Sequence, residues 1–110
     1  MKQIIIATLI ITTLFIIMIS HVVTAFEQED LDRLLKTGHC RKCDLRKADL
    51  QGIDLQGADL DKANLQGANL AGANLKKARM SRVNLAGANL AEANLQEARI
   101  YDANLENANL

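Results

Sequence analysis

The sequence predicts an all-β solenoid that follows an N-terminal export segment. The main observation is a period of five residues that runs from position 43 to the end of the chain. Leu occupies every fifth position from 45 to 110, except that Met80 and Ile100 stand in two of the fourteen places. Ala lies two positions before eleven of these residues, and the other three have Cys43, Ile53 and Val83. The chain also has only three aromatic residues and no Pro, which suits a narrow interior and coils that use every backbone N–H.

Neither an α-helix nor a flat strand can bury this pattern on one side. Five residues advance a helix by about 500°, so successive Leu residues would turn apart by about 140°. On a strand, an odd period sends alternate Leu residues to opposite faces. The chain must therefore turn once per repeat, so that every Leu points to one axis, as in a solenoid.

The residues between the apolar positions suit a turn in each repeat. Asp or Asn directly precedes most of the Leu residues, and we expect these residues to form the turn, because they tolerate unusual φ angles and bond to nearby backbone. Gly relieves further turns at positions 52, 57, 67, 72 and 87.

Residues 1–25 predict the export segment. Lys2 is followed by an uncharged apolar run from Ile4 to Ile19, and the segment ends in small residues up to Ala25. This pattern is typical of a signal peptide that is cleaved after Ala25. The alternative is an uncleaved single-pass membrane anchor on residues 4–25, since the uncharged stretch reaches the roughly 20 residues that span a bilayer. Both interpretations place the rest of the chain outside the cytoplasm, in a periplasm or a thylakoid lumen.

A short helix is predicted over residues 27–37, within a segment 26–42 that leads into the repeats. Leu31, Leu34 and Leu35 have the i, i+3, i+4 spacing of one helical face, and Gly38 is placed to end the helix. We expect the helix to cover the open end of the solenoid, because an open β edge invites pairing with other chains. A helix that binds a partner or a membrane surface is the alternative.

The repeats resemble the pentapeptide-repeat family, whose motif is A(D/N)LXX. The resemblance covers residues 43–110 and implies a right-handed, four-sided β-helix, in which fourteen repeats make about three and a half coils. The run from Leu34 to Leu45 also resembles the segment before the repeats of exported members. The family resemblance implies a structural or protein-interaction role, and it brings one alternative, because some members are DNA-mimic inhibitors of topoisomerase.

Cys40 and Cys43 form a Cys-Arg-Lys-Cys motif for which three interpretations are open. In an exported protein an even number of cysteines indicates a disulfide, and both residues fall in repeat register at inward positions, so that they form a structural pair. A redox protein acting through Cys40 and Cys43 is the second interpretation, although the βαβ context of thioredoxin-like motifs is missing. A metal site would use His39 with both cysteines and would be one ligand short of tetrahedral zinc.

Composition excludes several functional classes. The chain has 13 basic and 13 acidic residues and a formal net charge of +0, which argues against a nucleic-acid binder held by bulk charge and against an acidic DNA mimic. It has no nucleophile elbow, phosphate loop or His-rich metal motif. We therefore expect no catalytic residue, no cofactor and no metal site, and the protein is predicted not to be an enzyme.

Surface positions give the repeats their individuality. If one coil takes twenty residues, one face carries Arg79, Arg82, Arg99 and Tyr101, and the neighbouring face carries Lys76 and Lys77. Together these six residues are the candidate interaction face. Such a face would bind an acidic protein or a lipid head group. The alternative is a solvated face with cross-coil ion pairs such as Asp59–Arg79, which contribute little.

The repeats run in register to Leu110 with no predicted covering helix behind them. Terminal repeats normally need a polar cap. We therefore expect self-association or partner binding at the C-terminal coil.

Overall fold

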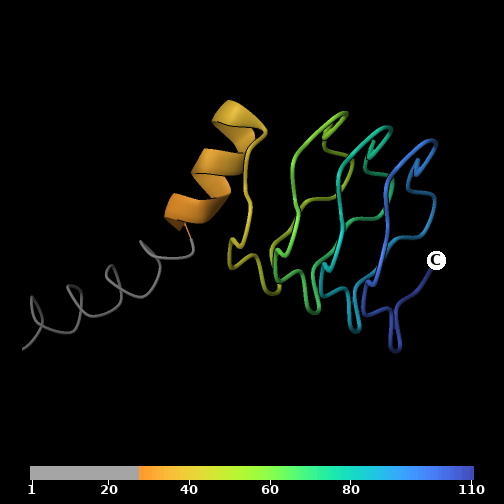
Figure 1. Ribbon diagram of the computed structural model, residues 1–110. Coiled ribbons are helices and arrows are strands. Elements are labelled where there is room, and N and C mark those ends of the chain that lie inside the picture. Colours follow the sequence, from red (N-terminus) through yellow and green to blue (C-terminus); the bar gives the residue numbers. More distant parts are fainter. Residues whose placement is uncertain (1–27) are drawn as a thin grey trace, which may run out of the picture.

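A computed structural model describes residues 28–110, which form one helix and a stack of coils (Figure 1). The export segment, its cleavage position after Ala25 and the anchor on residues 4–25 lie outside the described residues. Within residues 28–110, no helix is both long and apolar enough to cross a bilayer.

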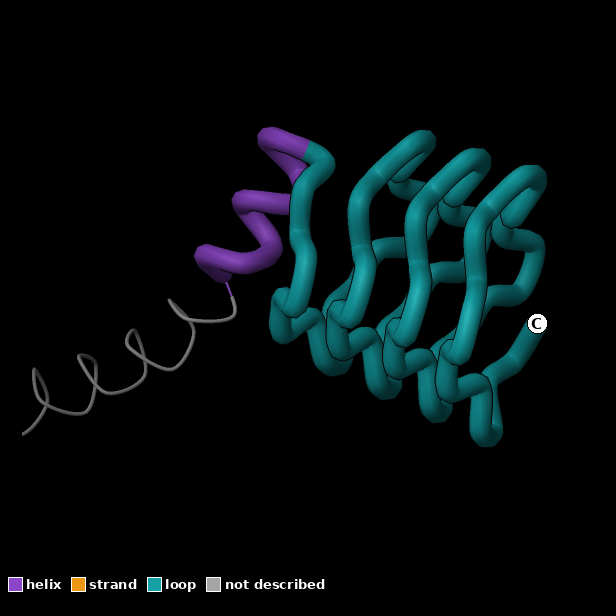
Figure 2. The backbone as a smooth tube through the Cα atoms, viewed as in Figure 1, coloured by secondary structure: helices purple, strands orange, loops and turns teal. Residues whose placement is uncertain are grey.

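The coils are held together by single parallel β-bridges rather than by long strands. Eleven bridges join residues that are twenty positions apart, from His39 with Asp59 to Asn89 with Asn109. Bridged positions recur every five residues, so each coil has four bridged segments joined by four turns (Figure 2). The coil length of twenty residues that the sequence predicted is therefore confirmed.

Backbone hydrogen bonds link each repeat to the repeat one coil later. Leu45 N–H donates to the Asn64 carbonyl at 2.8 Å, Asn64 N–H donates to the Cys43 carbonyl at 2.9 Å, and Lys47 N–H donates to the Gln66 carbonyl at 2.9 Å. Within the turn, Ala48 N–H donates to the Leu45 carbonyl at 3.1 Å. The same pattern recurs around the coils, which is why a repeat that lacks Pro suits this fold.

The interior consists of the apolar positions that the five-residue period marks. The Leu residues of the repeats from Leu45 to Leu90 are all buried, and Ala fills the position two residues before most of them. Met80 and Val83, which depart from the pattern, are buried as well. Burial falls off in the last coil, where Leu105 and Leu110 are exposed.

The Asp and Asn residues stabilise the turns in one of the two ways expected. Their side chains accept hydrogen bonds from the backbone N–H two residues later, as from Arg46 to Asp44 at 3.3 Å and from Ala86 to Asn84 at 3.1 Å. The expectation that they adopt unusual φ angles is wrong. Positive φ occurs three residues after them, at every fifth position from 42 to 107, where the chain has five of its Gly residues and nine other residues.

The helix spans residues 28–37 and lies at the end of the stack where the first coil begins (Figure 1). Leu34 is buried and Leu31 is partly buried, and both pack against the core of the coils. Leu35, the third residue of the predicted face, is 51% exposed. Gly38 ends the helix with a φ of 67° and donates its N–H to the Leu34 carbonyl at 2.8 Å.

Candidate interaction face

Four residues of the candidate interaction face (Arg79, Arg82, Arg99 and Tyr101) lie on one side of the coils, and Lys76 and Lys77 lie on the turn that leads into it. Arg79 and Arg99 occupy bridged positions and pair with each other across adjacent coils. The turn that precedes Arg79 carries Lys76 and Lys77, and the turns that follow Arg79 and Arg99 carry Arg82 and Tyr101. We call this side, with residues 39–42, 59–62, 79–82 and 99–102, the arginine side.

Two buried aspartates organise the arginine side. Asp59 and Asp61 are 8% and 7% exposed and are the only buried charged or polar residues in the part of the chain that the structure describes. Arg79 lies 3.7 Å from the Asp59 carboxylate and 3.1 Å from that of Asp61. Arg41 approaches the same carboxylates from the preceding coil, at 3.7 Å and 3.9 Å. Asp61 also accepts a hydrogen bond from Ser81 N–H at 3.0 Å, so the two acids link three coils.

Sequence reasoning found only part of this network. The pair Asp59–Arg79 was expected from the twenty-residue register. The register also places Asp61 on this face, but its contacts with Arg79 and Ser81 were not predicted. Arg41 was missed, although positions 41, 61, 81 and 101 lie in one column. Arg41 could have been found by extending the twenty-residue register to the residues before Cys43. The structure follows the register there, because the first bridge already involves His39.

The ion pairs leave the arginine side with excess positive charge. It carries six basic residues (Arg41, Lys42, Lys62, Arg79, Arg82 and Arg99) and three acidic residues (Asp59, Asp61 and Asp102), hence a net charge of +3. Among residues 28–110, none of the carboxylates lies within 4.0 Å of a basic group of Lys62, Arg82 or Arg99. Lys77 lies 3.9 Å from Glu97, but both side chains are more than half exposed, so this pair contributes little.

A groove of about 350 Å³ runs along the arginine side over residues of four successive coils. Seven residues line it: Arg41, Asp61, Lys62, Ser81, Arg82, Tyr101 and Asp102. Tyr101 is 65% exposed and is the only aromatic residue among residues 28–110. The groove thus combines cationic side chains with one aromatic surface, a combination that suits binding rather than proton or group transfer.

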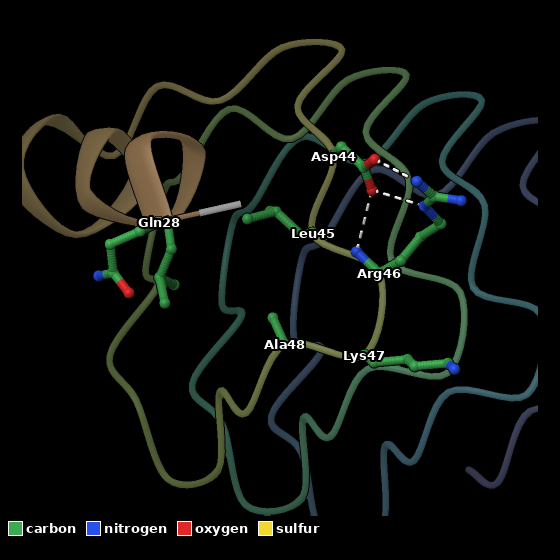
Figure 3. Close-up of a pocket in the computed structure, with 7 residues that line it drawn as sticks. Gln28, Asp44, Leu45, Arg46, Lys47 and Ala48 are labelled. Atoms are coloured by element: carbon green, nitrogen blue, oxygen red, sulfur yellow. Dashed lines mark hydrogen bonds and ion pairs between the residues drawn. The ribbon is translucent and has the colours of Figure 1, made fainter. Parts of the chain in front are cut away.

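A second groove of about 380 Å³ lies between the helix and the first coil (Figure 3). It is lined by Gln28 and Leu31 of the helix and by residues 44–48. Arg46 binds the Asp44 carboxylate through Nε at 2.8 Å and through a second guanidinium nitrogen at 2.6 Å. These hydrogen bonds from Arg46 lower the pKa of Asp44 below its usual value. The pair is bidentate, and both residues line this groove.

A disulfide joins Cys40 and Cys43, whose Cα atoms are 5.2 Å apart. The two residues are 0% and 2% exposed. The Cys40 sulfur also lies 3.2 Å from the Asp30 carbonyl oxygen of the helix. The disulfide is therefore shielded from solvent, and the helix contacts it at Cys40. Within residues 28–110, no group of three His, Cys, Asp or Glu side chains is placed to hold a metal ion.

Comparisons with known proteins agree with this architecture. The pentapeptide-repeat family model matches residues 39–76 and 78–110, with 8 copies. Among solved structures, the chain is similar to the pentapeptide repeat protein Rfr23 from the cyanobacterium Cyanothece 51142, with 35% identity and a TM-score of 0.56. The alignment covers 64% of this chain and 52% of Rfr23, so the chain spans about half the length of that protein.

Two further solved structures are similar in sequence. A pentapeptide repeat protein from the Arabidopsis thaliana thylakoid lumen is 28% identical over 67% of this chain and 55% of its own, with a TM-score of 0.46. HetL, involved in heterocyst differentiation regulation in the cyanobacterium Nostoc, is 31% identical over 66% of this chain and 46% of its own, with a TM-score of 0.27. No curated protein matches the chain in sequence. Because the repeat model matches well over half of the residues, the chain belongs to the pentapeptide-repeat family.

Proposed function

We propose that this protein is an exported, non-catalytic interaction module that binds a partner protein through the arginine side. The observation that carries the proposal is the uneven distribution of charge around the coil. The arginine side has a net charge of +3, whereas the opposite side, with residues 49–52, 69–72, 89–92 and 109–110, has only the two acids Asp49 and Glu92. A folded scaffold that needed only solubility would not require such a contrast between its sides.

The buried aspartates support the same proposal. Asp59 and Asp61 pair with Arg41 and Arg79, while Lys62, Arg82 and Arg99 on the same side have no carboxylate partner among residues 28–110. A partner's carboxylates can therefore pair with these three cations without breaking an existing ion pair.

Charge reversal on this side tests partner binding. We expect the double variant Arg82→Glu/Arg99→Glu to lose partner recovery when the tagged protein is used as bait in an exported fraction. The control Lys36→Glu/Lys47→Glu makes the same change in net charge on the helix and on another turn, and it is expected to recover the partner normally. Unchanged recovery with Arg82→Glu/Arg99→Glu would refute the role of the arginine side.

Export is a separate part of the proposal, based on the signal-peptide pattern of residues 1–25. The N-terminal sequence of the expressed protein tests it. A mature chain that begins at Phe26 in a soluble exported fraction supports cleavage after Ala25. A chain that begins at Met1 and sediments with membranes supports the single-pass anchor, and a chain that begins at Met1 in the cytosol contradicts export.

The alternative of a DNA-mimic topoisomerase inhibitor has less support. Such a protein would present acidic residues along its sides, whereas the most charged side of this coil is basic. The buried position of Cys40 and Cys43 favours a structural disulfide over the alternative of a redox protein.

A further inference from the structure

The turn that follows the bridged position of the arginine side has an unusual set of residues at positive φ. In this column the chain places Lys42, Lys62, Arg82 and Asp102, with φ angles from 52° to 62°. Each of the other three turn columns contains at least one Gly at this position, and those columns read Lys47, Gly67, Gly87, Asn107; Gly52, Gly72, Glu92; and Gly57, Lys77, Glu97. This column alone has no Gly and stacks three cations in successive coils.

Two local costs accompany this column. A residue with a Cβ atom is strained in the left-handed region, where Gly is not. Like charges stacked across neighbouring chain segments also repel, and successive coils are only about 4.8 Å apart. No carboxylate among residues 28–110 lies within 4.0 Å of the Lys62 or Arg82 side chain to offset this repulsion. Residues that are strained or that repel one another without stabilising the fold are typical of functional sites.

The cationic column lines the groove of the arginine side. Lys62 and Arg82 contribute to its wall together with Tyr101. We infer that this groove is a docking site for an acidic, extended peptide segment of a partner protein, a deepening that rests on the proposed function. Carboxylates of the segment pair with Lys62 and Arg82, and an adjacent side chain packs on the Tyr101 ring.

The charge pattern favours a peptide over a densely charged polyanion. Asp61 and Asp102 also line the groove, and they repel a ligand that carries a charge on every unit. In an extended peptide, side chains on one face are about 6.8 Å apart. Because Lys and Arg side chains are long, cations on successive coils can each reach one carboxylate of such a segment.

The test uses a fluorescent octapeptide of alternating Glu and Ala, with a Gln-for-Glu version as the uncharged probe and inorganic polyphosphate as a competitor. In anisotropy titrations at low salt, we expect the protein to bind the Glu peptide at least tenfold more tightly than the Gln peptide. Raising the salt concentration should weaken binding. Equal affinity for the two peptides, or polyphosphate binding tighter than the Glu peptide, would overturn the assignment.

Substitution by Gly separates binding from folding. We expect Lys62→Gly/Arg82→Gly to reduce affinity for the Glu peptide at least tenfold while the melting temperature stays level or rises, because Gly relieves the strained φ. The matched control Lys47→Gly removes a cation at the same position of another turn, and its affinity should stay within twofold. If the Gly variant does not fold, Lys62→Gln/Arg82→Gln removes the charges and keeps the side chains, and unchanged affinity in either variant refutes the site.

The outcomes also distinguish this inference from the proposed function. Loss of partner recovery in Arg82→Glu/Arg99→Glu without any binding of the Glu peptide would leave the arginine side as an interaction surface and overturn only the acidic-peptide assignment. Unchanged partner recovery with Arg82→Glu/Arg99→Glu would refute both the interaction surface and the acidic-peptide assignment.

Discussion

The Asp30 carboxylate accepts a hydrogen bond from the backbone N–H of Asp44 at 2.8 Å. One coil later, the equivalent N–H of Asn64 donates to the backbone carbonyl of Cys43 at 2.9 Å. Asp30 therefore stands where a carbonyl group of a preceding coil would lie. The helix covers the first coil with Leu34 and also provides the hydrogen-bond acceptor that this coil would otherwise lack.

This relationship predicts that Asp30→Ala destabilises the fold. The substitution leaves the Asp44 N–H without its acceptor at a partly buried position, which costs about 1–3 kcal/mol. Asp32→Ala is the control, because Asp32 accepts a side-chain hydrogen bond from Gln28 within the helix, just as Asp30 accepts one from Arg33. Urea unfolding followed by circular dichroism should show a clearly lower midpoint for Asp30→Ala, and equal midpoints for both variants would contradict the role of Asp30.

The regular part of this fold could be predicted from the sequence because every repeat buries side chains at the same two positions. The period of five gave the inward Leu positions and, with twenty residues per coil, the pair Asp59–Arg79. The location of positive φ could not be predicted from residue preference, because that position holds Gly in only five of fourteen turns. The role of Asp30 depends on a contact between the helix and the first coil, and periodicity carries no information about such a contact. Asp61 does fall in the register of Arg41 and Ser81, but the register alone does not say which side chains in a column pair.

Gly52→Ala tests the strain at positive φ. Gly52 has a φ of 66°, and a Cβ atom added there would meet no atom within 4 Å, so the cost comes from backbone conformation alone. We expect a loss of about 1 kcal/mol in the free energy of unfolding. Gln51→Ala, one residue earlier in the same turn and absent from the positive-φ positions, should change stability by less than half of that amount. A Gly52→Ala variant as stable as the parent protein would contradict the argument.

The buried disulfide is expected to resist reduction in the folded protein. Both cysteines are almost fully buried and the Cys40 sulfur contacts the helix backbone. Mass spectrometry after thiol alkylation should detect little reduced protein with dithiothreitol alone and full reduction once urea is added. Rapid reduction without urea would instead favour an accessible redox pair. The double variant Cys40→Ala/Cys43→Ala should lose about 2 kcal/mol of stability, since the bond closes only a short loop.

The pKa of Asp44 should respond to Arg46. The Arg46 side chain holds this pKa below its usual value, so Arg46→Ala should raise the pKa toward the usual value of an aspartate. Carboxyl-detected NMR titration measures the shift directly. Because the folded pKa is the lower one, the interaction stabilises the fold above the unfolded pKa, and this contribution is lost as pH falls through the folded pKa. A pKa of Asp44 that is the same in both proteins would show that Arg46 is not its cause.

Asp61 should contribute more to stability than Asp102, the exposed acid of the arginine side. It contacts Arg79 at 3.1 Å and Ser81 N–H at 3.0 Å, whereas Asp102 is exposed. We expect Asp61→Ala to lower the free energy of unfolding by about 1–3 kcal/mol, and Asp102→Ala to change it by less than about 0.5 kcal/mol.

Asp61→Asn keeps an acceptor for Ser81 but loses the charge, so its stability should lie between those of Asp61→Ala and the parent protein. Because Arg41 and Arg79 are about half exposed, water can solvate them once Asp61 is gone. The backbone bond to Ser81 should therefore account for most of the loss, and an Asn variant as unstable as the Ala variant would assign that loss to the ion pairs instead.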